Sequence, residues 1–272
     1  MSNENKKSKI RLDLFLYEKG YYESRTKAEI AIREGKILVN NIKEDKPGTM
    51  IKEDSEIRII GDKCPFVSRG GYKLDKAIKT FNINLENFTC IDLGSSTGGF
   101  TDVMLKNNAK KIYAVDCGTN QLDYSIRIND KVVVMENTNA RYISKNEFNN
   151  DTIDFISADL SFISLKLVLK VIYNLLKIDG ESVVLIKPQF EAGREKIEKG
   201  GVVRDINIHI DVINEIIDYA KNIGFYINGI TYSPIKGPNG NIEYLLYLSK
   251  IHNDKNAEYN IKDVVIKSHQ EL

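Results

Sequence analysis

Short apolar runs and amphipathic runs alternate along the chain from residue 88 onward. The apolar runs predict seven strands, at residues 89–94, 111–118, 131–137, 153–160, 182–190, 226–233 and 243–249. Apolar positions at helical spacing predict helices around residues 98–107, 165–177 and 208–223. Because such apolar strands must be covered on both faces, the alternation predicts a mostly parallel sheet between two layers of helices. The loop before the last strand is too short for a helical crossover, so the last two strands are expected to pair antiparallel.

The first sixty residues carry a different pattern, with shorter elements. An apolar face at Leu12, Phe15 and Leu16 predicts a first helix, and Ser24 is a suitable N-cap for a second. Two short strands are expected at residues 36–40 and 55–60. We therefore expect a small α+β domain at 1–60, a linker at 61–67, the main domain at 68–250, and a polar tail or short helix at 251–272.

Composition narrows the class of protein without deciding its function. Residues 1–80 hold 18 Lys and Arg against 13 Asp and Glu, whereas residues 81–272 hold 21 against 25. A basic front of this kind is typical of proteins that face nucleic acid, although chance on a charged surface produces the same asymmetry. No long uncharged apolar run and no apolar leader is present, so we expect neither a membrane partner nor export, and a cytoplasmic location. The cysteines and histidines are scattered, which predicts no metal site.

The front of the chain resembles the S4 RNA-binding domain of ribosomal proteins, pseudouridine synthases and some tRNA synthetases. The resemblance lies in R-L-D at 11–13, S-R-x-x-A at 24–28 and G-x-I-x-V-N at 35–40. It implies contact with structured RNA through shape and phosphates, whereas the alternative is a two-helix cap over the next domain. The candidate RNA-binding residues here are Arg11, Arg25, Lys27, Arg33 and Lys36.

Three further arginines are candidates for RNA contact in the larger domain: Arg69, Arg194 and Arg204. The last two lie in a long, charged, glycine-bearing loop at 191–205. This loop is either a lid over the ligands or a plain surface connection.

The stretch FTCIDLGSSTGGFTDVML at 88–105 has the outline of a strand, a glycine-rich turn and a helix. It lacks two nucleotide fingerprints, because Ser96 replaces a required glycine of the dinucleotide turn and no G-K-[S/T] follows. Two acids stand near it: Asp92 precedes the turn, and Asp116 ends the next strand. A carboxylate at the second strand can accept from both hydroxyls of a ribose, which favours S-adenosyl-L-methionine, a cofactor without phosphates. The alternative is that both acids only cap turns.

The candidate cofactor-binding residues surround this turn and the ends of the following strands. Asp92 is expected to orient the turn or the amino end of the cofactor, and Asn137 is expected near the adenine. The complete set is Asp92, Gly94, Ser95, Ser96, Thr97, Gly98, Gly99, Phe100, Asp116, Cys117, Asn137 and Asp159.

Four charged residues are candidates for the chemistry. Asp159 and Lys187 end neighbouring apolar strands, Glu243 begins the last strand, and Lys73 stands in the motif SRGGYKL. An ammonium and a carboxylate at such strand ends are costly to bury unpaired, so they form either an ion pair or a working site.

These four residues resemble the Lys-Asp-Lys-Glu tetrad of FtsJ-like ribose 2′-O-methyltransferases. The whole chain resembles the hemolysin A (TlyA) family of ribosomal RNA 2′-O-methyltransferases, on the motifs SRGGYKL, DLGSSTGGFTD, NARY, ADLSFISL, KPQFEAGR and KGGVVRD. The resemblance implies a Rossmann-like, seven-stranded methyltransferase domain with its last strand antiparallel, behind an S4 domain. It also implies that Lys73, Asp159, Lys187 and Glu243 are catalytic, and that the substrate is a cytidine of ribosomal RNA in ribosomal subunits. Neither the residues nor the resemblance indicates an oligomeric state.

A role for each member follows from the chemistry of a ribose hydroxyl. This hydroxyl is a poor nucleophile, and it must be aligned with the methyl group and lose its proton during attack. A lysine can take the proton only when a fraction of it is neutral, which a neighbouring cation favours. We hypothesise that Lys187 is the base or oxygen-polarising group and Lys73 its cationic neighbour. Asp159 would orient Lys187 and the amino end of the cofactor, and Glu243 would orient the lysine pair.

Several rival functions are weighed against this hypothesis. An RNA base methyltransferase acting on an exocyclic amine would carry an Asn/Asp-Pro-Pro-aromatic turn after the fourth strand, but D-L-S-F stands there. A base methyltransferase with a cysteine nucleophile would need that cysteine near the RNA base, but Cys117 lies at the cofactor end of the second strand. A pseudouridine synthase would need no cofactor turn, and a membrane-lysing protein would need a long cationic amphipathic helix. A non-catalytic RNA-binding or ribosome-assembly protein stays open until methyl transfer is assayed.

Overall fold

The computed structural model describes residues 9–60, 64–252 and 259–272. The chain divides into two compact units, one ending at Lys63 and the other beginning at Cys64. Part of the expected linker (61–63) and part of the expected tail (253–258) lie outside the described residues. The finer domain boundaries expected from the sequence therefore stay predictions.

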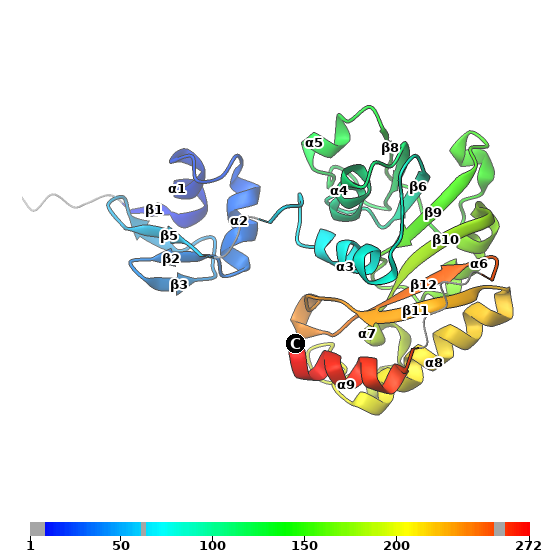
Figure 1. The fold of residues 1–272 in the computed structure, drawn as a ribbon. Coiled ribbons are helices and arrows are strands. Elements are labelled where there is room, and N and C mark those ends of the chain that lie inside the picture. Colours follow the sequence, from blue (N-terminus) through cyan, green and yellow to red (C-terminus); the bar gives the residue numbers. More distant parts are fainter. Residues whose placement is uncertain (1–8, 61–63, 253–258) are drawn as a thin grey trace, which may run out of the picture. The chain divides into compact units, whose positions relative to one another are not determined.

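Within residues 9–60, the smaller unit is built from two helices and five three-residue strands (blue in Figure 1). In chain order they are β1 (Lys9–Arg11), α1 (Leu12–Glu18), α2 (Arg25–Arg33), β2 (Ile37–Val39), β3 (Ile42–Glu44), β4 (Met50–Lys52) and β5 (Ile57–Ile59). Ser24 caps α2 as predicted, because its hydroxyl accepts from the amide of Lys27. The apolar faces of both helices pack on Ile37 and Ile51 in one core.

Two of these five strands were expected from the sequence, β2 and β5. They pair antiparallel with each other, with β3 on the outer side of β2, whereas β1 pairs separately with β4. β1, β3 and β4 hold only one or two apolar residues each beside lysine, arginine or glutamate, so no apolar run marks them in the sequence.

The larger unit is built on one seven-stranded sheet, which confirms the expected fold class. Its strands are β6 (Thr89–Leu93), β7 (Lys111–Val115), β8 (Val132–Met135), β9 (Ile153–Ala158), β10 (Leu176–Ile186), β11 (Tyr226–Tyr232) and β12 (Tyr244–Ser249). Their order across the sheet is β11-β12-β10-β9-β6-β7-β8. The last strand, β12, runs antiparallel to both of its neighbours, as predicted for its pairing with β11. Strand β10 begins at Leu176, six residues before the predicted start at Ser182.

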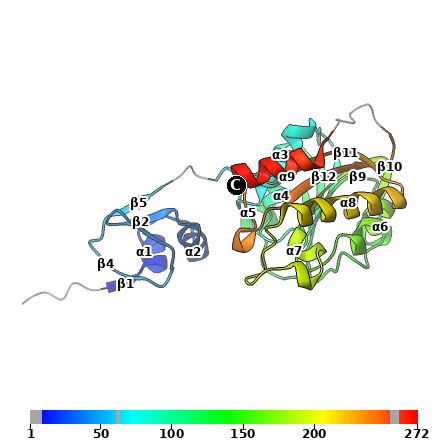
Figure 2. The same ribbon diagram turned by 90° about the horizontal axis from the view of Figure 1, so that it is seen from below.

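Helices cover both faces of this sheet (Figures 1 and 2). They are α3 (Gly71–Phe81), α4 (Gly99–Lys106), α5 (Tyr124–Arg127), α6 (Lys166–Leu175), α7 (Pro188–Glu191), α8 (Ile206–Ile223) and α9 (Ile261–Glu271), the last of which was expected in the tail. Buried residues of α6, α8 and α9 pack on one face with Ile91, and those of α3 and α4 pack on the other with Cys90. None of the helices in the described residues is long and apolar enough to span a lipid bilayer.

The register of the sheet places the ends of its central strands along one edge. Leu93 at the end of β6 pairs with Ala158 at the end of β9, and Ala158 pairs in turn with Val184 near the end of β10. Ile186 at the end of β10 pairs with Tyr244 at the start of β12. The residues that directly follow or precede these positions must therefore gather at this edge of the sheet.

Candidate active site

The four predicted catalytic residues meet in one cluster at the carboxyl edge of the sheet. The Asp159 carboxylate contacts both ammonium groups, at 3.0 Å from Nζ of Lys73 and 2.6 Å from Nζ of Lys187. The Glu243 carboxylate lies 2.6 Å from Nζ of Lys73. Lys187 also donates a 3.1 Å hydrogen bond to the hydroxyl of Ser161, which the sequence analysis did not single out. Four segments that are distant in the sequence thus converge on one chain of ion pairs.

Burial and charge act against each other in this cluster. Lys73, Lys187 and Glu243 are buried, and 18% of the Asp159 side chain is exposed. Burial alone would lower the pKa of Lys73, but the carboxylates of Asp159 and Glu243 outweigh it and raise that pKa. Burial alone would raise the pKa of Asp159, but the two ammonium groups outweigh it and lower that pKa. Lys73 is therefore held as a cation and Asp159 as an anion near neutral pH.

The glycine-rich turn after β6 lies beside this cluster. Gly94 has φ of +82°, and a Cβ atom on it would stand 2.6 Å from the carbonyl oxygen of Asp159. Gly98 has φ of +91° and Ser96 has φ of +47°, so the turn passes repeatedly through the left-handed region. A side chain at Gly94 would therefore clash with the backbone that carries Asp159, in a conformation that already disfavours side chains.

Asp116, the acid predicted at the end of β7, accepts hydrogen bonds that connect the neighbouring loops. One carboxylate oxygen of Asp116 accepts from the amide of Ser96 at 2.8 Å, and the other accepts from the amide of Gly118 at 2.7 Å. The amide of Thr138 donates to the carbonyl of Asp116, and that of Asn137 to the carbonyl of Gly118. The predicted cofactor residues of three loops thus form one bonded group, in which Ser96, Cys117 and Asn137 are exposed.

Two predicted cofactor residues, Asp92 and Phe100, have buried side chains. Asp92 is fully buried, and its carboxylate accepts from the hydroxyls of Thr101 at 2.7 Å and Ser157 at 2.9 Å. Burial raises the pKa of Asp92 to about 6, although both hydroxyls oppose the shift. Phe100, on α4, is buried in the core that α3 and α4 form on this face of the sheet. These bonds are consistent with the predicted role of Asp92 in orienting the turn, and its contact with the amino end of a cofactor stays a prediction.

Gly99, another predicted cofactor residue, lies against the segment that precedes α3. A Cβ atom on Gly99 would stand 2.5 Å from the hydroxyl of Ser68 and 2.9 Å from the amide nitrogen of Gly71. The SRGG segment at 68–71 therefore lies directly on the start of α4. Because the two segments approach so closely, the first turn of α3, which carries Lys73, is positioned at the edge of the sheet.

The loop after β9 holds an aromatic residue that the sequence analysis did not select. Phe162 is 90% exposed and has φ of +62°, which is an outlier for a bulky residue. Its ring lies 5.1 Å from that of Phe190, between ring centroids, and the preceding Ser161 bonds Lys187. The sequence signal for this residue is the aromatic position of the motif DLSF, which follows the polar Asp159 and Ser161.

Two predicted RNA-binding arginines of the smaller unit share a buried acid. Arg11 and Arg25 each place a guanidinium nitrogen 2.8 Å from a carboxylate oxygen of Asp13, whose side chain is fully buried. The hydrogen bond from Arg11 is the main reason why the pKa of Asp13 lies well below its usual range. Both arginines therefore have a structural role, but 46% of each side chain is exposed and keeps donors for a further partner.

Some of the other predicted RNA-binding residues form ion pairs with acidic side chains of the same unit. Lys27 and Lys36 each pair with a glutamate at 2.7 Å, and Arg33 is exposed at the end of α2. In the larger unit Arg69 and Arg194 are exposed, and Arg204 pairs with Glu198. The expected cationic surface is therefore less positive than a count of its basic residues suggests.

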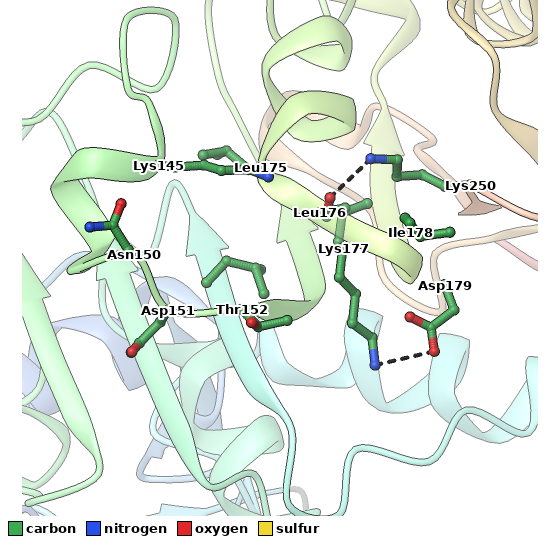
Figure 3. A pocket seen from close by; sticks show the side chains of 11 residues that line it. Lys145, Asn150, Asp151, Thr152, Leu175, Leu176, Lys177, Ile178, Asp179 and Lys250 are labelled. Atoms are coloured by element: carbon green, nitrogen blue, oxygen red, sulfur yellow. Dashed lines mark hydrogen bonds and ion pairs between the residues drawn. The ribbon is translucent and has the colours of Figure 1, made fainter.

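A cavity of about 470 Å³ lies at the other edge of the sheet, at the starts of β9 and β10 (Figure 3). Lys250 donates from Nζ to the carbonyl of Leu176 at 3.0 Å, and Lys177 pairs with Asp179 at 3.3 Å. These contacts hold the junction between α6 and β10. The cavity is separate from the cluster of Lys73, which lies where the strands end.

Comparison with known proteins gives the family. The model of the S4 domain matches residues 10–57, and that of the FtsJ-like methyltransferases matches residues 66–250. The chain is 46% identical to "Putative rRNA methyltransferase YqxC" of Bacillus subtilis, over 88% of this chain and 85% of that protein. It is 37% identical to "16S/23S rRNA (cytidine-2'-O)-methyltransferase TlyA" of Mycobacterium tuberculosis, over 88% of this chain and 90% of that protein.

Among solved structures, the chain resembles "Putative hemolysin from Streptococcus thermophilus", with a TM-score of 0.77 and 43% identity over 97% of each chain. The matches cover both units, and they agree with the geometry of the cluster and the turn. The chain therefore belongs to the FtsJ-like methyltransferases, in the hemolysin A (TlyA) family that carries an S4 domain before the catalytic domain.

Proposed function

We propose that this protein transfers a methyl group from S-adenosyl-L-methionine to the ribose 2′-hydroxyl of a cytidine in ribosomal RNA. The observation that carries the proposal is the chain of ion pairs among Lys73, Asp159, Lys187 and Glu243 beside the glycine-rich turn. The names of the relatives from Bacillus subtilis and Mycobacterium tuberculosis support an RNA substrate and, for the latter, a cytidine ribose.

The residues around the turn fit S-adenosyl-L-methionine. Each carboxylate oxygen of Asp116 accepts one backbone amide and keeps a second acceptor position for a ribose hydroxyl. The turn at 94–98 presents backbone without bulky side chains, and Asn137 is exposed beside the loop of Asp116. When bound, the cofactor supplies an electrophilic methyl group on a positively charged sulfur.

The two lysines are suited to different tasks. Lys73 lies between two carboxylates and is held as a cation. Lys187 contacts Asp159, a carboxylate that it shares with Lys73, and is the better candidate to polarise the 2′-hydroxyl and take its proton. Asp159 orients both ammonium groups, and Glu243 acts on Lys187 through Lys73. This arrangement refines our hypothesis that Glu243 orients the lysine pair.

A ribose can reach this buried cluster only if its nucleotide leaves the RNA stack. Phe162 is suited to receive the extruded nucleotide, because its ring is exposed next to the loop that bonds Lys187. Stacking on an aromatic ring contributes about 1–3 kcal/mol per base. The S4 unit would hold the surrounding RNA through Arg11, Arg25 and Arg33, and the loop at 191–205 would act as a lid. A ribosomal substrate also accounts for the cytoplasmic location that we expect.

The test is methylation of purified ribosomal subunits with methyl-labelled S-adenosyl-L-methionine, followed by digestion to nucleosides. The proposal requires label on ribose, and label on a base would refute it. Lys187→Ala and Lys187→Arg should each lower kcat by about 100-fold or more, because arginine keeps the charge but does not give up its proton. Lys79→Ala is the matched control, since Lys79 lies on α3 with 74% of its side chain exposed. A subunit-binding assay on the same samples separates a non-catalytic RNA-binding protein from an enzyme.

A further inference from the structure

A glycine in the loop between β11 and β12 stands against the buried end of Glu243. A Cβ atom built on Gly237 would lie 2.3 Å from Oε1 of Glu243 and 2.8 Å from its carboxyl carbon. Both separations are far below a normal contact between heavy atoms. The backbone of Gly237 has no positive φ, so only this space, and not the conformation, excludes a side chain.

The loop that carries Gly237 cannot move away without breaking other bonds. The amide of Gly237 donates to the carbonyl of Asn241 at 2.8 Å. Asn241 is buried, and its side chain donates to the carbonyl of Gly201 at 2.9 Å and accepts from the amide of Val203 at 3.3 Å. A shift of the loop would therefore leave buried polar groups unpaired, at a cost of about 1–3 kcal/mol each.

The side chain of Glu243 is the part that would have to yield. Its backbone carbonyl is fixed by the amide of Ser233 at 2.8 Å, whereas the carboxylate is held by Lys73 at 2.6 Å. Rotating the carboxylate away from a new methyl group would lengthen this ion pair in a site that excludes water. Lys73 would then keep only Asp159, which it already shares with Lys187.

We propose that Gly237 is a positioning residue for methyl transfer, because its missing side chain leaves the space that holds the Glu243 carboxylate against Lys73. This inference rests on the proposed function of the cluster. Gly237 itself touches no substrate, and it acts on the lysine pair through Glu243.

Gly237→Ala should lower kcat for RNA methylation at least 10-fold and change the Kd of S-adenosyl-L-methionine less than twofold. Gly240→Ala is the matched control in the same loop. Gly240 has φ of +88° with no atom within 4 Å of a built Cβ, so alanine there strains the backbone without touching Glu243. An equal loss of kcat in both variants would attribute the effect to loop strain and overturn the proposal.

The same substitution in a Glu243→Ala chain tests the proposal even if Gly237→Ala folds poorly in the wild-type chain. In a Glu243→Ala chain the space is vacant, so adding Gly237→Ala should change neither Tm nor the residual kcat by a measurable amount. A loss of Tm as large as in the wild-type background would refute the proposal. The proposed function is judged separately, by whether the wild-type chain labels ribose: if it does and Gly237→Ala keeps full kcat, only the inference about Gly237 fails.

Discussion

The buried histidine of α8 makes a quantitative prediction about acid stability. His209 is fully buried, and its two ring nitrogens lie 2.7 Å from the hydroxyl of Tyr244 and 2.9 Å from the carbonyl oxygen of Val203. Because a carbonyl can only accept, Nε2 carries the proton and Nδ1 accepts from Tyr244. Burial lowers the pKa of His209 to about 4; the nearby ring of His269 adds to this, and Val203 and Asp205 oppose it.

The magnitude follows from the difference between this pKa and that of an unfolded histidine, about 6.5. Between these two values the unfolded chain binds a proton that the folded chain does not, so stability falls as the pH falls. From pH 7 to pH 4 the contribution lost is about 3 kcal/mol, at 1.36 kcal/mol for each unit of pKa shift. This is a large part of a typical unfolding free energy of about 5–15 kcal/mol.

Asp92 acts in the opposite direction, so the pH profile of the wild-type chain alone cannot test the prediction. Its pKa is raised to about 6, and the folded chain binds the extra proton between about pH 4 and pH 6. Stability therefore rises in that window as pH falls, by about 2 kcal/mol. The His209→Gln variant retains Asp92 but has no titrating side chain at position 209. The contribution of Asp92 therefore cancels when the wild-type chain is compared with this variant.

The assay is urea unfolding followed by far-UV circular dichroism at pH 7 and pH 4. The transition of the larger unit is identified by its larger m-value, because m scales with the surface exposed on unfolding. Between the two pH values the wild-type chain should lose about 3 kcal/mol more than His209→Gln. If both proteins lose the same free energy, His209 is not held neutral by its surroundings and the reasoning is wrong.

Three further outcomes are expected. Phe162→Ala should lower kcat/KM for RNA by about 5- to 100-fold, because a stacking surface is lost. Its Tm should not change, because no core contact is removed. A kcat/KM near that of the wild-type enzyme would contradict the proposed role of Phe162. Asp13→Ala should destabilise the smaller unit by about 2 kcal/mol, because Arg11 and Arg25 lose their shared buried partner. The measurement is the urea transition of that unit. An unchanged transition would show that the two ion pairs contribute little to its stability. Gly94→Ala should lower both Tm and methylation, because its Cβ would meet the carbonyl of Asp159; retention of both would disprove that close approach.

Much of the fold was predictable because long apolar strands leave a clear pattern. The positions of Asp159, Lys187 and Glu243 next to strand ends were enough to predict that they meet, since parallel strands end at one edge of a sheet. The early start of β10 was not predictable, because Lys177, Asp179 and Glu181 interrupt the apolar run at its exposed beginning.

Other features depend on contacts that leave no local signal in the sequence. The buried carboxylate of Asp92 accepts from Thr101, on the helix after the turn, and from Ser157, on a neighbouring strand, and both hydroxyls reach it only in the folded domain. The buried position of Asp13 likewise hid the fact that Arg11 and Arg25 already share an acidic partner. The positive φ of Phe162 was also invisible, because nothing in DLSF requires it.

The position of β12 between β10 and the edge strand β11 has a consequence for the order in which the sheet can be completed during synthesis. Glu243 directly precedes this strand, which enters the sheet between β10 and β11 after every other strand has been made. A nascent chain that ends before Glu243 holds Lys73, Asp159 and Lys187 without Glu243, and its sheet lacks the strand that joins β11 to β10. Because domains fold as translation proceeds, chains that stop before Glu243 should not methylate RNA if the four residues act as we propose.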